Sequence, residues 1–473
     1  SNNSTSAGST NYFNDVLGWD SLEVGETQTA SSGASRKRDV SMMGRLNYRY
    51  NDRYLVTFTV RRDGSSVFGR NNKYATFPSA AVAWIVSEES FLKNNAKWID
   101  MLKLRVSWGK IGNQAISAYG TLTQSATTKY VFGDGGNTSI GIYPSAMGNN
   151  NLKWETTTST NVAIDFQLFQ NRLSGTLEYY NTKTNDLLLK QNLPIMTGFP
   201  QVWTNLGEVK NSGVEVTLNS VNLQTPKFSW STDFVFSYNK NKIVSLYGID
   251  ADGDGHEDDD IANAWFIGQP VHVEYDYVFD GIYQIGDPMP AGYQPGYVRV
   301  KTASDDPTQV ADASDKEVIG QKEPKFRWGL NNTFRYGNWS LSAFVNATHG
   351  WIAKFDRILP YKPGAPVNML DVGYWTDRNQ SNSRPSLVYT NPLNHRFYLK
   401  RDFIRIQDVT LAYTFNKQQL SQMGIQKLRI YATVKNLCTF TDWLGFDPET
   451  GNVPGENGFP TPRTFMLGLN FSF

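Results

Sequence analysis

The chain ends with the stretch RTFMLGLNFSF (463–473), in which apolar and other side chains alternate. Successive side chains of a strand point to opposite faces, so the apolar ones share one face. They are Phe465, Leu467, Leu469, Phe471 and Phe473. Soluble domains usually let their terminal residues fray into water. A terminal strand with one apolar face therefore indicates a surface covered by something other than water.

The same period of two recurs along the chain. In SMMGRLNYRY (41–50) one face carries mainly Leu, Met and Tyr, and the other carries mainly Arg and Asn. In FSWSTDFVFSY (228–238) the apolar face is aromatic and the opposite face is mainly Ser and Asp. A strand with one apolar and one polar face lies between two unlike environments.

Short turns and long polar loops alternate between these strands. The long loops cover 61–74, 110–152, 188–206, 240–323, 352–396 and 441–461. Most exceed the ~12–15 residues above which an irregular loop usually has a function. Bacterial outer-membrane barrels are built in this way, with short periplasmic turns and long extracellular loops.

The pattern predicts about thirteen strands. They lie near 40–50, 53–62, 74–86, 99–110, 152–168, 172–188, 205–221, 226–240, 324–336, 338–350, 397–415, 427–440 and 463–473. The β-rich segment 265–284 would break the alternation of ends, so we place it among the loops. Closed bacterial barrels of one chain have even strand numbers. The fold class is therefore all-β, a transmembrane antiparallel up-and-down barrel present in part, although a smaller closed barrel remains an alternative.

Composition excludes several classes of function. The 45 basic and 44 acidic residues give a formal charge of +1, without the basic surface that nucleic acids require. The single cysteine, Cys438, excludes internal disulfides, and four histidines leave little for catalysis, so we expect no enzyme. No stretch is apolar enough for a membrane helix. A soluble secreted protein that binds or hydrolyses carbohydrate is the alternative, but the Ser- and Asn-rich polar faces favour the barrel.

Six blocks of the chain resemble the barrel of SusC/RagA-type TonB-dependent transporters. They include MMGRLNYRYNDRYLVTFTVRRDGSS (42–66), LKLRVSWGKIGNQ (102–114), TGFPQVWTNLGEVKNSGVEV (197–216) and PTPRTFMLGLNFSF (460–473). The others are WFIGQPVHVEYDYVFDGIYQ (265–284) and PKFRWGLNNTFRYGNWSLSAFV (324–345). The blocks follow the family's order.

The resemblance implies an integral barrel of about 22 strands in the outer membrane of a Gram-negative bacterium, in contact with its lipid. It also implies import of oligosaccharides or peptides, with a SusD-like surface lipoprotein and the TonB complex as partners. About thirteen of these strands lie in this chain. Residues 1–38 would then be the remnant of an extracellular loop, and residues 39–473 the C-terminal part of the barrel. The plug domain and the first strands would lie outside the chain.

The stretch GIDADGDGHEDDDI (248–261) predicts a calcium site. Asp250, Asp252 and Asp254 stand at positions 1, 3 and 5 of a loop like that of an EF-hand, and Gly255 stands at the turn position 6. The remaining candidate ligands are His256, Asp258 and Asp260. Position 12 is Ile261 where an EF-hand has a bidentate Glu, so a solvated acidic loop is the alternative.

Aromatic and polar side chains of the long loops are candidates for substrate contact. They are Phe199, Trp203, Tyr361, Tyr374, Trp375, Arg378 and Tyr389. Aromatic rings stack on the apolar faces of sugars, but the same rings also serve to pack loops against one another.

Overall fold

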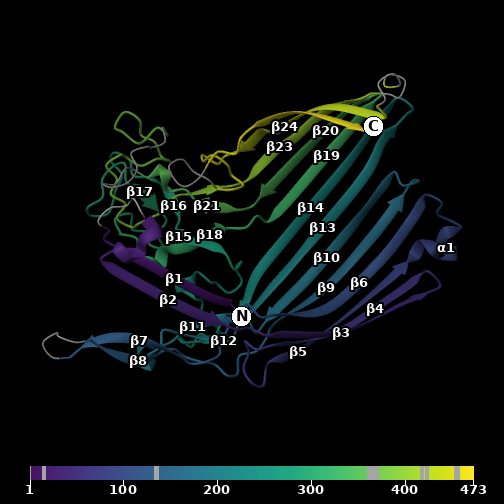
Figure 1. Ribbon diagram of the computed structural model, residues 1–473. Coiled ribbons are helices and arrows are strands. Elements are labelled where there is room, and N and C mark those ends of the chain that lie inside the picture. The colour runs from purple at the N-terminus through teal and green to yellow at the C-terminus, as the bar shows by residue number, and fades with distance from the viewer. Residues whose placement is uncertain are drawn as a thin grey trace.

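The computed structural model describes residues 2–12, 18–132, 138–359, 372–415, 420, 425–451 and 459–472. Antiparallel strands are the main secondary structure of the described chain (Figure 1). No helix in these ranges is long and apolar enough to cross a membrane.

Thirteen strands form one sheet in which each strand pairs with its neighbours in an antiparallel manner. The first six in chain order are β3 (Asp39–Tyr50), β4 (Tyr54–Ser65), β5 (Tyr74–Ile85), β6 (Ile99–Asn113), β9 (Glu155–Leu168) and β10 (Leu173–Asn185). The other seven are β13 (Glu208–Gln224), β14 (Phe228–Ser245), β19 (Phe326–Tyr336), β20 (Trp339–His349), β23 (Phe403–Thr414), β24 (Lys427–Thr441) and β25 (Thr464–Ser472). The predicted strand number and all-β class are confirmed.

The sheet follows chain order from β3 at one edge to β25 at the other. Within the described residues these two edge strands do not pair with each other, so the sheet is open, as a barrel present in part requires. Phe473, placed on the apolar face of the last strand by the sequence pattern, lies outside the described residues.

Twelve shorter strands form six two-stranded sheets in the loops. At the ends of β3, β6 and β10 are β1 (Asn2–Thr10) with β2 (Thr27–Ser35), β7 (Gln124–Val131) with β8 (Thr138–Ala146), and β11 (Leu188–Asn192) with β12 (Gln201–Asn205). The remaining pairs are β15 (Val273–Tyr277) with β18 (Lys316–Gln321), β16 (Phe279–Ile282) with β17 (Val298–Val300), and β21 (Ile352–Lys354) with β22 (Tyr398–Lys400). Residues 1–38, expected to be a loop remnant, thus carry the β1–β2 hairpin.

The helices whose bounds fall within the described residues are short and lie between strands. They are α1 (Ser90–Lys93) and the 3-10 helices η1 (Gly18–Val24), η2 (Val86–Glu88), η3 (Ile195–Thr197), η4 (Ile261–Asn263), η5 (Ala313–Asp315) and η6 (Asp356–Ile358). Figure 1 shows α1 at the short-turn end of the sheet, opposite the end where the small sheets of the loops gather.

The structure differs from the sequence prediction over 397–415. One strand is predicted there, but β22 pairs with β21 in the loops and β23 begins only at Phe403. Asp402 lies at the break, where its carboxylate accepts a hydrogen bond from the N–H of Gly350 at 2.7 Å. By contrast, the two strands of the segment 265–284, β15 and β16, pair with loop strands, as we expected.

The pairing register aligns the apolar face across neighbouring strands. One row of directly paired residues runs Val106, Val162, Tyr179, Val214 and Tyr238 across β6, β9, β10, β13 and β14. The next rows toward the short turns hold leucine, isoleucine, valine and aromatic side chains. A sheet of this kind presents one continuous apolar face to its surroundings, and transmembrane barrels present such a face to lipid.

Aromatic rings pair across strands near the short turns. Trp98 stacks on Phe169 with ring centroids 5.6 Å apart, Trp230 stacks on Phe334 at 5.7 Å, and Trp339 meets Tyr413 edge to face at 4.9 Å. Amphipathic rings gather at membrane–water interfaces in this way. These rings occupy the position of an aromatic girdle, at the short-turn boundary of the apolar face.

A charge placed on the apolar face tests its contact with lipid. Val216→Lys in the full-length protein is expected to cost about 2–4 kcal/mol, because a lysine near the middle of the lipid-facing band must be desolvated. Thr217→Lys is the matched control, since Thr217 is the next residue of β13 and points to the polar face. The free energy of unfolding of both variants is measured in lipid vesicles, with the loss of heat-modifiable gel mobility as the signal of unfolding. Equal effects of the two substitutions would contradict the assigned faces.

Candidate functional site

Three of the long loops, those after β14, β20 and β24, form one folded body with a common hydrophobic core. Its buried residues come from three loops: Tyr277, Ile282, Tyr283, Tyr297, Val298, Val300 and Ala311 from the first, Phe355, Ile358, Trp375, Tyr389 and Phe397 from the second, and Trp443 from the third. Loops with a shared core hold their side chains in fixed positions. We call these segments the loop body.

Two of the predicted substrate contacts lie inside this core. Trp375 is 7% exposed, and its indole Nε1 donates to Oε1 of Gln284 at 2.9 Å. Tyr389 is 6% exposed, and its hydroxyl donates to Oδ1 of Asn391 at 2.9 Å. Neither ring has a face open to a ligand in this structure. Burial raises the pKa of Tyr389, so this hydroxyl stays protonated.

The other predicted contacts are dispersed. Arg378 is exposed on the loop body, whereas Tyr374 is half-buried and its hydroxyl has no hydrogen-bond partner among the described residues. Phe199 is half-buried on the β11–β12 hairpin. On the same hairpin, the ring of Trp203 lies 5.2 Å from the ammonium of Lys190. Tyr361 lies outside the described residues.

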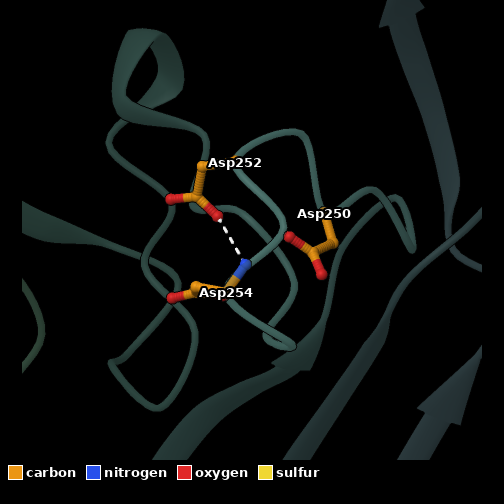
Figure 2. A group of neighbouring side chains, drawn as sticks. All are labelled: Asp250, Asp252 and Asp254. Atoms are coloured by element: carbon orange, nitrogen blue, oxygen red, sulfur yellow. Dashed lines mark hydrogen bonds between the residues drawn. The ribbon is translucent and has the colours of Figure 1, made fainter.

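Three aspartates of the acidic loop do converge. The carboxylates of Asp250, Asp252 and Asp254 each offer an oxygen within 4.8 Å of the others, and all three residues are exposed (Figure 2). Backbone N–H groups order the loop: Gly253 and Gly255 donate to Asp250 at 2.7 and 3.0 Å. The backbone N–H of Asp254 donates to Asp252 at 3.2 Å. Hard carboxylate oxygens at this spacing fit a cation such as Ca²⁺.

The remaining predicted ligands lie outside this group. Oδ2 of Asp258 accepts from the N–H of Ala251 at 3.0 Å. Oδ2 of Asp260 accepts from the hydroxyl of Tyr247 at 2.7 Å, and its carboxylate also caps η4 through Asn263. Burial works to raise the pKa of Asp260, but the hydrogen bonds from Asn263 and Tyr247 outweigh it and lower that pKa. The Asp260 carboxylate therefore fastens the loop. His256 is expected to offer its backbone carbonyl at position 7 of the loop, and its ring is not among the converging groups.

A buried ion pair, missed by sequence reasoning, fastens the last loop to the sheet. The guanidinium of Arg405 on β23 bonds Asp447 and Glu449 at 2.8 Å each. The side chains of Arg405 and Asp447 are 5% and 2% exposed. Breaking such a pair leaves a buried charge without compensation, which costs about 3–5 kcal/mol. The stretch FDPETG (446–451) shows both acids in the sequence, but only the fold shows that they meet Arg405.

Arg401 adds a second clamp on the same loop. Its guanidinium lies 3.9 Å from the ring centroid of Trp351 and donates to the carbonyls of Pro448 and Glu449 at 2.7 Å each. The cation–π contact with Trp351 and the two charge-assisted hydrogen bonds hold residues 448–449 against the segment that precedes β23. The clamped loop borders a cavity of about 670 Å³, which is lined on the polar face by Glu215, Arg327, Asn346 and other side chains.

Charged side chains are also neutralised on the polar face nearer the short turns. Arg105 makes a bidentate pair with Asp165 at 2.7 and 3.0 Å and lies 3.6 Å from Glu178. Thr176 and Asn161 donate hydrogen bonds to these two carboxylates. Paired charges and polar groups of this kind line a lumen that holds water or another polar domain.

The comparisons with known proteins fit this architecture. Residues 2–437 match the family model described as TonB dependent receptor-like, β-barrel. The chain belongs to this family. It is 34% identical to TonB-dependent receptor P3 of Formosa agariphila and 30% identical to TonB-dependent receptor SusC of Bacteroides thetaiotaomicron. These alignments cover 99% and 98% of the chain and 49% and 47% of the relatives.

Solved structures show the same fold. The RagAB peptide transporter aligns with a TM-score of 0.76 at 25% identity, over 96% of this chain and 50% of that chain. The open-open state of the RagAB peptide importer aligns with a TM-score of 0.78. The chain thus spans about half the length of the relatives that it matches. The recognised likeness to SusC and RagA is confirmed, and its family is one of outer-membrane transporters, not of enzymes.

A buried histidine packs within the loop body. His395 is 1% exposed between Phe279 and Phe397, and its Nδ1 has no hydrogen-bond partner among the described residues. Burial lowers the pKa of His395 from 6.5 to about 4, although Asp276 and Asp356 act in the opposite direction. The folded loop body therefore holds a neutral imidazole at pH 7.

The stability of the loop body is expected to fall as the pH drops from about 6.5 toward 4. In this window the unfolded loop binds a proton that the folded loop excludes, so acid favours unfolding, by about 2 kcal/mol at pH 5. Hydrogen exchange of residues 389–399 at pH 7 and pH 5 measures the change. His395→Leu removes the titrating group and should flatten this pH dependence, whereas an unchanged profile in the variant would show that other groups cause it.

Proposed function

We propose that this chain is the C-terminal barrel portion of a TonB-dependent importer that carries oligosaccharides or peptides across the outer membrane. The observation that carries the proposal is the open thirteen-stranded sheet with an apolar face, a polar face and a folded loop body. Transport makes no covalent bond, so the required parts are a polar path, loops that receive the substrate and a displaceable plug. RagAB is a peptide transporter with this barrel fold, which supports peptides as one substrate class.

The proposed partners follow from the relatives. A SusD-like surface lipoprotein would cover the loop end, where the loop body lies, and the TonB complex would supply energy through the N-terminal part of the full-length protein. That N-terminal part would provide the plug and the first barrel strands. The polar face and the cavity beside the clamped last loop would then border the path of the substrate.

The proposed substrate contacts are fewer than the sequence suggested. Arg378, Phe199 and Trp203 retain accessible groups, so we keep them, together with Tyr361. Trp375 and Tyr389 fill the core of the loop body, so we withdraw both rings from the set. The hydroxyl of Tyr374 is buried, so we assign this side chain to packing as well.

The decisive experiment measures uptake by cells that express the full-length protein. Fluorescent peptides and oligosaccharides of the size that the barrel admits should enter cells only when the transporter, its lipoprotein partner and TonB are all present. Deletion of TonB should abolish accumulation inside the cell while surface binding persists, because TonB supplies energy and not affinity. Accumulation that is unchanged without TonB would contradict the proposal, and the probe that accumulates identifies the substrate class.

We also propose that the acidic loop binds Ca²⁺ through Asp250, Asp252 and Asp254. Their converging carboxylates support it, since three like charges this close repel one another without a cation. Bound Ca²⁺ would stiffen the end of β14 and the segment that follows it. His256, Asp258 and Asp260 are proposed only as outer partners of this site.

Removal of Ca²⁺ by a chelator is expected to raise hydrogen exchange in residues 248–258 of the full-length protein. Asp252→Ala combined with Asp254→Ala should abolish the effect of the chelator, because it removes the side-chain oxygens of two of the three converging carboxylates. Asp305→Ala is the control in a different acidic segment. If calorimetry detects no Ca²⁺ binding to the wild type, or binding that the double variant retains, the loop is a solvated acidic turn.

A further inference from the structure

A row of lysines crosses the apolar side of the sheet at its loop end. Directly paired residues run Lys110, Thr158, Lys183, Lys210 and Lys242 across β6, β9, β10, β13 and β14. Figure 1 shows these five strands side by side in the middle of the sheet. We call these four lysines the lysine row. They are far apart in the sequence, so only the register brings them together.

The lysine row is placed on the face that the apolar rows occupy. On the same face, the second row from the lysine row toward the short turns contains Val162, Tyr179 and Tyr238. Between them is a mixed row that includes Trp108 and Lys240, so a fifth lysine adjoins the four. Successive rows on one face are about 7 Å apart along the strands. The lysines therefore stand just above the apolar band, at the height of an interface.

The positive charges are crowded. Lys183, Lys210 and Lys242 stand on adjacent strands, which are about 4.8 Å apart, so the three stems span only about 10 Å. Like charges directly opposite each other on one face destabilise a sheet. Only one ion pair relieves this crowding within the described residues: Lys183 contacts Glu208 at 2.7 Å. Lys110, Lys210, Lys240 and Lys242 are exposed and make no ion pair with a described residue.

We infer that the lysine row binds the phosphate groups of a phosphorylated glycolipid in the outer leaflet. Ammonium groups form strong charge-assisted hydrogen bonds with phosphate, and a cluster of them supplies the countercharge of a di-anionic headgroup. The long stems can lie along the apolar surface while the charged ends reach the headgroup layer. The inference rests on the proposed outer-membrane location, with the loop end facing outward.

The position of the row favours lipid over other anions. An anionic substrate would travel along the polar face, whereas these side chains point to the opposite face. A lipoprotein that covers the loop end would meet the loop body before it met strand residues next to the apolar band. Basic residues at a membrane surface attract anionic lipid with an energy that adds up over the cluster. The continuous apolar band directly below identifies the occupant as a lipid whose chains cover that band.

The test uses the full-length transporter in detergent and two probes, a diphosphorylated lipid A and the same lipid after phosphate removal. Native mass spectrometry measures how much of each lipid stays bound. The phosphorylated form should bind more tightly to the wild type. The triple substitution of Lys183, Lys210 and Lys242 by Gln should weaken this binding by about fivefold for each lysine removed, and Lys210→Gln alone by about fivefold. Substitution of the same three by Arg should retain it.

The matched control replaces three exposed lysines elsewhere, Lys129, Lys227 and Lys427, by Gln, with the same change of charge. Equal binding by the row and control variants would overturn the inference, as would a wild type that does not distinguish the two lipids. Displacement of the lipid by millimolar inorganic phosphate would show a free-anion site and overturn the assignment to lipid. A protein that leaves the cell envelope without detergent would instead refute the proposed location, which is a separate result.

Discussion

The structure depends on one constraint: a backbone that crosses hydrocarbon must satisfy all its N–H and C=O groups within the protein. Eleven of the thirteen strands do so through neighbours on both sides, but β3 and β25 each have one unpaired edge. Both edge strands run from the loop end to the turn end, so they cannot pair with each other in an antiparallel manner. An odd number of further strands closes such a sheet. The chain spans about half the length of the relatives that it matches, which leaves room for such strands in the proposed full-length protein.

The same constraint separates the chemistry of the two faces. Side chains on the lipid side contribute only transfer energy and packing, so they are apolar through the middle and change to rings or charges at the boundaries. Side chains on the polar face are free to form networks such as that of Arg105 with Asp165. At the loop end of the strands, charged side chains occur on both faces of the sheet. The lysine row on one face and the clamped last loop on the other lie at the ends of the same set of strands.

The sequence predicted the sheet well because each transmembrane strand carries its own signal. Period-two alternation is local, so the strands near 40–50 and 226–240 are visible without knowledge of their partners. The loop body was not predictable in this way. Trp375 and Tyr389 looked like exposed rings, because nothing local shows that they share a core with Tyr297 of another loop and with Phe355 from a distant part of their own loop. The lysine row was missed for the same reason: its four members appear in unrelated segments, and only pairing register aligns them.

The acidic loop is an intermediate case. Spacing within GIDADGDGHE predicted that Asp250, Asp252 and Asp254 would converge, because a short turn brings alternate residues together. Asp260 lies outside the converging group, and its carboxylate instead bonds Tyr247 and Asn263. Local patterns therefore identify the side chains that a tight turn collects, but not those recruited by neighbouring structure.

The contacts of the loop body restrict where motion can occur in the proposed transport cycle. The loop body shares one core, and Arg401 and Arg405 hold the last loop through buried charges and a stacked ring. Opening any one of these loops alone would expose the core or leave a buried charge unpaired, which costs several kcal/mol. The β7–β8 hairpin, by contrast, presents exposed apolar side chains along its length, among them Ile140 and Ile142. In the proposed transporter, the fixed loop body would select the substrate and segments outside its core would move.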